Sequence, residues 1–300
     1  MASIFANYLI VDWSGASEPR TGADSIWICW LQVHKSGRWT FQSTNPDTRA
    51  RAYHEIRQHL LAAVKESQAT LVGFDFPLGY PHGFAAGLGR EVEKPWRAVW
   101  KAVASEVTDL DDNSNNRFEA AARLNMRFGG AAGPFWGRPA ARAVKGIGLR
   151  KPKQSDHGLA EMRLADTWLK GPQSPWKLNG AGSVGGQSLT GIPVLGRLRD
   201  DPALEPHARV WPFETGLAVP FGARPDQPRV VFAEVWPSLL RPPVPEGEVK
   251  DKIQVESLAQ HLAQLDRAGR LARLLAGPRE LNKEQREQIE REEGWILGVL

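Results

Sequence analysis

The chain has 300 residues, enough for one large domain or two ordinary ones with a complete hydrophobic core. Charged residues make up 24% and apolar residues 42% of the chain, which excludes a wholly disordered protein. The formal net charge of +4 permits a polyanionic partner but does not by itself indicate one.

No apolar run reaches the length of a membrane span, and the N-terminus lacks the basic and apolar pattern of a secretory signal. We therefore expect a cytoplasmic protein that does not enter a membrane. The single cysteine, Cys29, excludes a disulfide framework within one chain, which fits that compartment. One cysteine and scattered histidines also leave no structural zinc site, since His54 and His59 are off the helical spacing of a zinc pair.

The first 78 residues have the pattern of an α/β fold. Apolar runs and alternating residues predict strands, and an apolar stripe at helical spacing predicts one helix between them. The expected elements are strands at 8–12, 25–33 and 38–42, a helix that ends near residue 67, and a strand at 71–76.

Residues 79–228 are different, because they are rich in glycine, proline and tryptophan and show no clear alternation of strands and helices. Helical patches at 94–107 and 116–128 are separated by long irregular links such as 171–191. Long irregular segments in compact proteins often form lids, so we expect an insertion that covers one end of the sheet. The letters from Gly180 to Gly185 match a dinucleotide-binding fingerprint, but neither the strand before nor the helix after it is expected.

Regular structure is expected to resume with a strand at 229–236 and a helix at 250–268. A last helix at 282–293 begins with the spacing of a capping box. Residues 1–78 and 229–300 should therefore form one core, into which residues 79–228 are inserted.

Three of the predicted strands carry one carboxylate each near the C-terminal end: Asp12, Asp75 and Glu234. Ligands of open α/β sheets bind at that end of the strands. Acids gathered there repel one another strongly unless cations neutralise them, and hard oxygen ligands suit Mg²⁺ or Mn²⁺. Asp251 shares the apolar stripe of its helix, so we expect it to face the sheet and complete an acidic quartet.

Each acid also has a structural interpretation. Asp12 and Asp75 can accept hydrogen bonds from turn amides, and Glu234 can pair with an arginine. Asp251 can be an ordinary acid of a first helical turn, stabilised by the helix dipole. The convergence of three such strands favours the metal site.

Three segments resemble the family called domain of unknown function 429, whose members are described as predicted ribonuclease-H-like nucleases. They are VDWSGA at 11–16, GFDFPL at 73–78 and AEVWP at 233–237. The order of elements is also similar to the ribonuclease-H-like fold. The resemblance implies a three-layer α/β fold with a mixed sheet and a large irregular insertion.

The same resemblance implies that Asp12, Asp75 and Glu234 are the acidic positions of the family, with Asp251 as the acid of the helix. The helix departs from resolvase-like nucleases, because it lacks the Asp-rich start that is common there.

A basic segment in the insertion contains six cations and no acid. Such a segment can neutralise the phosphates of a bound nucleic acid, or it can be a solvated surface. The six residues are Arg138, Arg142, Lys145, Arg150, Lys151 and Lys153.

We therefore predict a metal-dependent nuclease that hydrolyses phosphodiester bonds of DNA or RNA by a two-metal-ion mechanism, with the four acids as ligands. One alternative is a phosphotransferase or ATPase of the actin and sugar-kinase kind, which requires two related halves and a second glycine-rich phosphate turn. The other alternative is a non-catalytic ligand-binding member of the fold.

Overall fold

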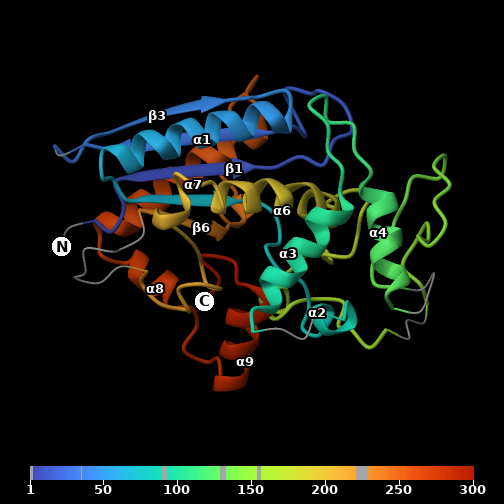
Figure 1. Ribbon diagram of the computed structural model, residues 1–300. Coiled ribbons are helices and arrows are strands. Elements are labelled where there is room, and N and C mark those ends of the chain that lie inside the picture. The colour runs from blue at the N-terminus through green and yellow to red at the C-terminus, as the bar shows by residue number, and fades with distance from the viewer. Residues whose placement is uncertain (1–2, 35, 90–92, 129–132, 154–156, 221–228) are drawn as a thin grey trace.

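A computed structural model describes residues 3–34, 36–89, 93–128, 133–153, 157–220 and 229–300. Its centre is a six-stranded sheet in the order β3-β2-β1-β4-β6-β5 (Figure 1). Within this sheet β2 runs antiparallel to both of its neighbours, whereas β1, β4, β6 and β5 run parallel to one another. The strands are β1 (Asn7–Asp12), β2 (Trp27–Val33), β3 (Trp39–Thr44), β4 (Thr70–Phe74), β5 (Ala208–Val210) and β6 (Val230–Glu234).

Helices cover both faces of the sheet and one of its ends. They are α1 (Arg49–Lys65), α2 (Phe84–Gly87), α3 (Pro95–Glu106), α4 (Arg117–Met126), α5 (Leu164–Thr167), α6 (Gly185–Arg199), α7 (Lys250–Arg267), α8 (Leu271–Leu275) and α9 (Lys283–Gln288). Short 3₁₀ turns are η1 (Glu205–His207) and η2 (Pro237–Leu239), and η3 (Ile289–Glu293) is a π-helical turn. None of the described helices is both long and apolar enough to cross a membrane.

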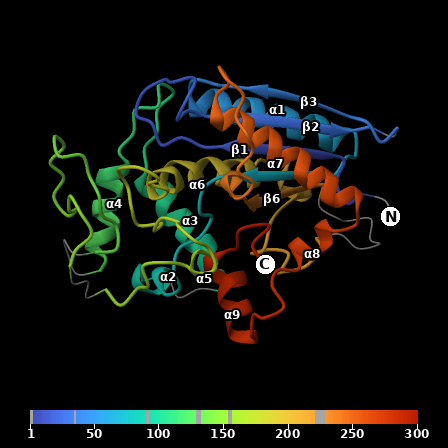
Figure 2. The same ribbon diagram turned by 180° about the vertical axis from the view of Figure 1, so that it is seen from behind.

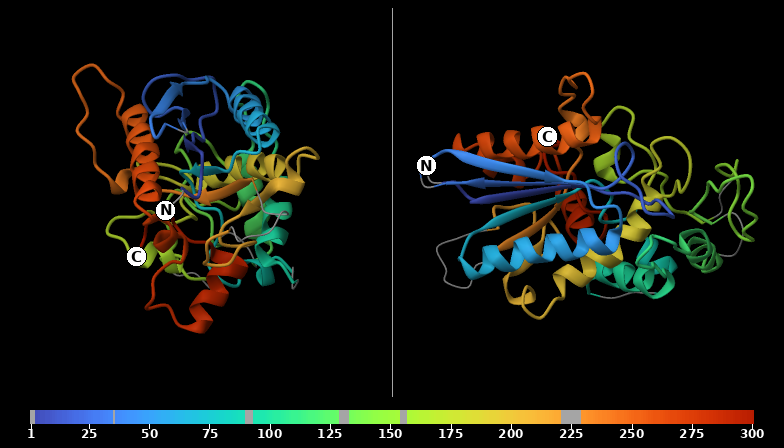
Figure 3. Two further views of the ribbon diagram at one scale, coloured as in Figure 1. Left: turned by 90° about the vertical axis from the view of Figure 1, so that its left-hand side faces the viewer. Right: turned by 90° about the horizontal axis from the view of Figure 1, so that it is seen from above.

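The molecule has three layers. Helices α1 and α6 lie on one face of the sheet and α7 lies on the other, as the views from behind and from above show (Figures 2 and 3). In β1, Leu9 and Val11 belong to the core shared with α1 and α6, whereas Tyr8 and Ile10 belong to the core shared with α7. This alternation follows from the two-residue period of a strand. The expected α/β class and mixed sheet are confirmed.

The elements expected from the two ends of the chain occur within a few residues of their expected bounds. The apolar stripe of α7 packs on the sheet through Val255, Leu258 and Leu262. The capping box that begins α9 also forms, because Asn282 accepts a hydrogen bond from the amide of Gln285 and Gln285 accepts one in return.

Two elements of residues 79–228 belong to the layers themselves. Helix α6 starts inside the link at 171–191 that was expected to be irregular, and it continues through Pro193. The short strand β5 extends the sheet beyond β6. A proline removes one helical hydrogen bond, but the buried apolar residues of α6 against the sheet outweigh that cost. The expectation of no helix here was wrong, and residues 221–228 of the insertion lie outside the described residues.

Helix α6 lies close to the segment that follows β4. A Cβ atom on Gly191 would lie only 2.4 Å from ring carbons of Phe76, so the absence of a side chain lets helix and segment touch. Helices α2, α3 and α4 of the insertion lie beyond the C-terminal ends of the parallel strands (Figure 1). The insertion therefore adjoins the end of the sheet where the acids were expected.

Candidate functional site

Asp12 and Asp75 are neighbours at the ends of two adjacent parallel strands. The register of β1 and β4 pairs Val11 with Phe74, so the two aspartates are the next residues on each strand. The amide of Asp75 donates to the carbonyl of Val11 at 3.0 Å, which continues the ladder to this point. Side chains two residues apart on a strand lie on the same face of the sheet. Ile10 and Gly73 lie on the face covered by α7, so the side chains of Asp12 and Asp75 lie on that face too.

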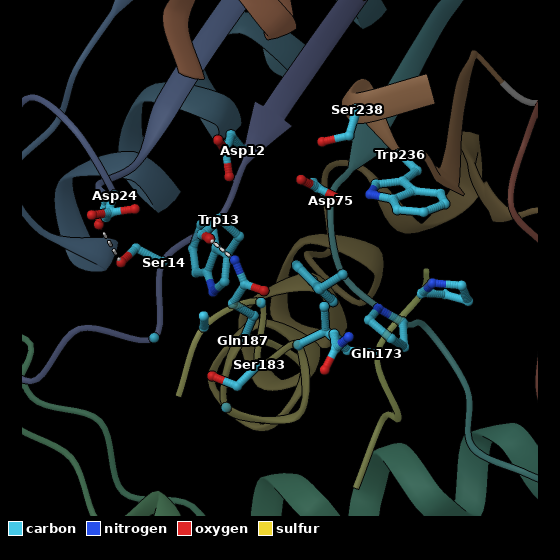
Figure 4. Close-up of a pocket in the computed structure, with 18 of the residues that line it drawn as sticks. Asp12, Trp13, Ser14, Asp24, Asp75, Gln173, Ser183, Gln187, Trp236 and Ser238 are labelled. Carbon is cyan, nitrogen blue, oxygen red and sulfur yellow. Dashed lines mark hydrogen bonds between the residues drawn. The ribbon is translucent and has the colours of Figure 1, made fainter. Parts of the chain in front are cut away.

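The two carboxylates face a cavity of about 650 Å³ (Figure 4). Both residues are half-buried, and neither carboxylate makes a hydrogen bond or an ion pair within the part of the chain that the structure describes. Burial, then Glu234 and then Asp251, raises the pKa of Asp75 to about 7. Burial, then Asp75, Asp251 and Asp24, raises the pKa of Asp12 well above its usual range, although Lys250 opposes this. Burial and mutual repulsion therefore make it unfavourable to ionise both carboxylates here.

Asp251 lies at the start of α7 and lines the same cavity, as the helical stripe predicted. Its Oδ2 accepts a hydrogen bond of 2.8 Å from the amide of Asp24, in the loop between β1 and β2. The structure therefore brings Asp12, Asp75 and Asp251 to one cavity, and Glu234 is also part of its lining.

Glu234 is placed differently from the other predicted acids. The register of β4 and β6 pairs Phe74 with Glu234, one residue before Asp75, so the side chain of Glu234 alternates to the opposite face. There Arg163 donates to both of its carboxylate oxygens at 2.6 and 2.7 Å, and the amide of Leu78 donates at 3.0 Å. The ion pair that the sequence left open as an alternative is thus present. The expectation that Glu234 offers a free carboxylate does not hold.

Arg163 was not singled out from the sequence. It is fully buried and also contacts Asp166, which accepts from its Nη2 at 2.9 Å. A buried glutamate does predict a cationic partner. The partner is 71 residues away in an irregular segment, however, so no local pattern identifies it.

Glycine-rich turns lie on a second wall of the cavity. The segment Gly180–Gly185 leads into α6, which supplies the helix that the sequence did not predict there. A Cβ atom on Gly15 would lie 3.1 Å from the backbone of Gly186, so the loop after β1 touches the first turn of α6. Gln187 also donates to the carbonyl of Trp13 (Figure 4). The residues after Asp12 are therefore held against a helix N-terminus.

None of the six basic residues of the insertion lines this cavity. Arg138 donates to carbonyl groups of its own loop, Arg142 pairs with Glu119 at 2.8 Å, and Lys151 pairs with Glu161 at 3.2 Å. The other three are exposed: Lys145, Arg150 and Lys153. Half of the basic segment is thus occupied by contacts within the protein, and its binding of nucleic acid stays a prediction.

A comparison of the chain with protein-family models, curated proteins and solved structures found no match. The resemblance of three short segments to domain of unknown function 429 therefore stays a prediction. Among the described residues, no group of three or more histidine, cysteine, aspartate or glutamate side chains is placed to hold a metal ion as it stands. Any ion at this site would depend on water or substrate for most of its ligands.

The raised pKa of Asp75 gives a prediction for stability in the presence of EDTA. The unfolded carboxyl group titrates near 4 and the folded one near 7, so the wild type loses stability as the pH rises between these values. Asp75→Asn removes the ionisation and should stabilise the protein more at pH 8 than at pH 5. The difference between the two pH values should be about 2–4 kcal/mol, measured by urea unfolding. An equal effect at both pH values would contradict the raised pKa.

Proposed function

We propose that the protein is a divalent-metal-dependent hydrolase of phosphodiester bonds in DNA or RNA, with a ribonuclease-H-like fold. The observation that carries the proposal is the pair Asp12 and Asp75, two unpaired and half-buried carboxylates on adjacent parallel strands. A divalent cation removes the repulsion between two such groups, and Mg²⁺ is commonly bound through one or two carboxylates and several waters.

The sheet supports the fold part of the proposal. Strand order β3-β2-β1-β4-β6, with β2 antiparallel to its neighbours, agrees with the succession of elements on which the resemblance rests. Helix α1 lies between β3 and β4, α6 lies between β4 and β5 after the shorter helices α2 to α5, and α7 follows β6; α1, α6 and α7 form the outer layers.

The residues fit one ion better than two. Asp12 and Asp75 are hard oxygen donors without other partners, and Asp251 offers a third carboxylate close by. Glu234 does not fit, because both of its oxygens are bound by Arg163. We therefore propose a single Mg²⁺ or Mn²⁺ held by Asp12 and Asp75, in place of the two ions that the sequence suggested.

A bound divalent ion would neutralise charge on the phosphoryl oxygens and lower the pKa of the attacking water. The protein fold holds the carboxylates in position. Asp12 and Asp75 are held rigidly by the ladder of β1 and β4, and Asp251 is oriented by the amide of Asp24. Arg163 pairs with Glu234, so that Asp12 and Asp75 are left as the acids without a partner among the described residues of the cavity.

Direct binding of Mn²⁺ tests the proposal. Electron paramagnetic resonance of free Mn²⁺ should show that the wild type binds about one ion, and Asp12→Asn or Asp75→Asn should each weaken binding by at least about tenfold. Asp24→Asn is the matched control, since this acid lies at the rim with a side chain that is 85% exposed. Equal binding by the wild type and Asp75→Asn would refute the assignment.

One observation favours the phosphotransferase alternative as a second candidate. The glycine-rich turn Gly180–Gly185 adjoins the loop after Asp12, which is the kind of second phosphate turn that this alternative requires. It also requires two related halves, and the described residues form one sheet. Release of inorganic phosphate from ATP, with no cleavage of DNA or RNA in Mg²⁺ or Mn²⁺, would favour this candidate.

A further inference from the structure

Arg117 lines the same cavity as Asp12 and Asp75. Its guanidinium forms no ion pair among the described residues, although the charges of Asp109 and Glu119 act on it. It is the first residue of α4. Its Nη1 donates to the hydroxyl of Ser17 at 2.7 Å and to the side-chain oxygen of Asn115 at 2.9 Å, and both acceptors are neutral. Its Nε is buried and has no hydrogen-bond partner among the described residues. A buried donor that is left unpaired is costly, which points to an absent acceptor.

The neighbouring arginines differ from Arg117 in this respect. Arg49 pairs with Asp109 at 2.6 Å and Arg142 pairs with Glu119 at 2.8 Å. Burial, then the cations Arg49 and Arg142, lowers the pKa of Arg117 to about 10. The guanidinium is therefore still charged at neutral pH, and its positive charge is only partly compensated by the protein.

Arg117 also lies against the first turn of α6. A Cβ atom on Gly186 would lie 3.3 Å from its Nε, so a side chain there would crowd the guanidinium. No side chain caps this helix, whose N-cap residue is Val184. The amide of Gly185 already donates to the carbonyl of Lys177, but a helix N-terminus without a side-chain cap still favours an anion. Here the helix adds to the charge of a neighbouring arginine. Ser183, just before the helix, lies across the cavity from Asp75 (Figure 4).

We propose that Arg117 and the first turn of α6 bind a phosphate group of the substrate. A phosphate ester would then lie between the Arg117 guanidinium and the ion held by the carboxylates. Some of its oxygens would face the guanidinium and others would face the ion. The cavity of about 650 Å³ accommodates a ligand of nucleotide size. The ion part of this arrangement rests on the proposed function, whereas the phosphate part rests on Arg117 alone.

Calorimetric titration with inorganic phosphate, with and without Mn²⁺, tests the proposal. Arg117→Gln should raise the Kd of phosphate by about 10–100-fold, because a charge-assisted hydrogen bond is lost. Arg123→Gln is the matched control: it is the same substitution on the same helix, but Arg123 pairs with Glu106 and lies outside the cavity. It should change the Kd by less than about twofold. Arg117→Lys keeps the charge without the planar fork and should give an intermediate Kd.

Two results would overturn the phosphate site: no phosphate binding by the wild type, or equal Kd values for the wild type and Arg117→Gln. If Arg117→Gln does not fold, Arg117→Lys decides, and an unchanged Kd there counts against the site. Mn²⁺ binding separates this proposal from the proposed function. Phosphate binding that depends on Arg117 without any Mn²⁺ binding would refute the metal site alone, and Mn²⁺ binding without phosphate binding would refute the phosphate site alone.

Discussion

Asp75→Asn is expected to abolish metal-dependent hydrolysis of phosphodiester bonds, with a fall in kcat/KM of at least about 10²–10³-fold. In the proposed function, an ion at Asp12 and Asp75 would supply several kcal/mol of charge stabilisation in the transition state, and each 1.36 kcal/mol corresponds to tenfold in rate. Asparagine has almost the same shape as aspartate, but it offers no negative charge to the ion. The rates should be measured on single- and double-stranded DNA and RNA with Mg²⁺ and with Mn²⁺.

The stability of the same variant separates loss of the ion from loss of the fold. Because the buried carboxylate of Asp75 destabilises the folded protein at neutral pH, Asp75→Asn should be inactive and yet more stable than the wild type. Asp24→Asn, at the rim of the same cavity, should keep most of the activity. Turnover that survives Asp75→Asn would show that the hydrolysis arises at another site or from a contaminant.

Arg163→Met is expected to lower the free energy of unfolding by about 3–5 kcal/mol, which is the largest stability effect we predict. The side chains of Arg163, Asp166 and Glu234 are only 1%, 4% and 4% exposed, so removal of the guanidinium leaves two buried acids without a cation beside them. Burial raises the pKa of Glu234 and Arg163 opposes this, so the variant should favour the protonated glutamate. The deficit should therefore shrink as the pH falls, because protonation removes the buried charge.

Urea unfolding of Arg163→Met and Arg123→Met at pH 5 and pH 8 checks this prediction. Arg123 pairs with Glu106 on the surface, so the matched substitution should stay within about 1 kcal/mol of the wild type. Adding Glu234→Gln to Arg163→Met should recover part of the loss, since one uncompensated charge is then removed. A loss below 1 kcal/mol for Arg163→Met at pH 8 would show that the buried acids are neutral in the wild type too.

The elements at the two ends of the chain were predictable because each carries its own pattern. Strands β1 and β4 are short apolar runs that end at a charge or a proline, and α7 has an apolar stripe at helical spacing. Helix α6 was not predictable, since Gly185, Gly186 and Pro193 are poor residues for a helix. Its stability comes from burial against the sheet, which no window of sequence contains.

The candidate site was predictable in part, and the error had a geometric cause. The residue types and strand ends identified Asp12 and Asp75, and the helical stripe placed Asp251 towards the sheet. Glu234 stands at the end of a similar strand, but its register with Phe74 turns it to the other face. A shift of one residue in register reverses the face of a side chain, and the sequence does not state the register.

The sequence by itself determined that the chain forms an α/β sheet with acids at the ends of its parallel strands, because periodicity and strand-ending residues are local properties. Only the tertiary structure decided which acids remain unpaired. Arg163 neutralises Glu234 from 71 residues away, and Arg117 reaches the cavity beside a helix that the sequence did not indicate. Charge pairing depends on distances in space between segments far apart in the chain, and those distances are set by how the whole chain packs.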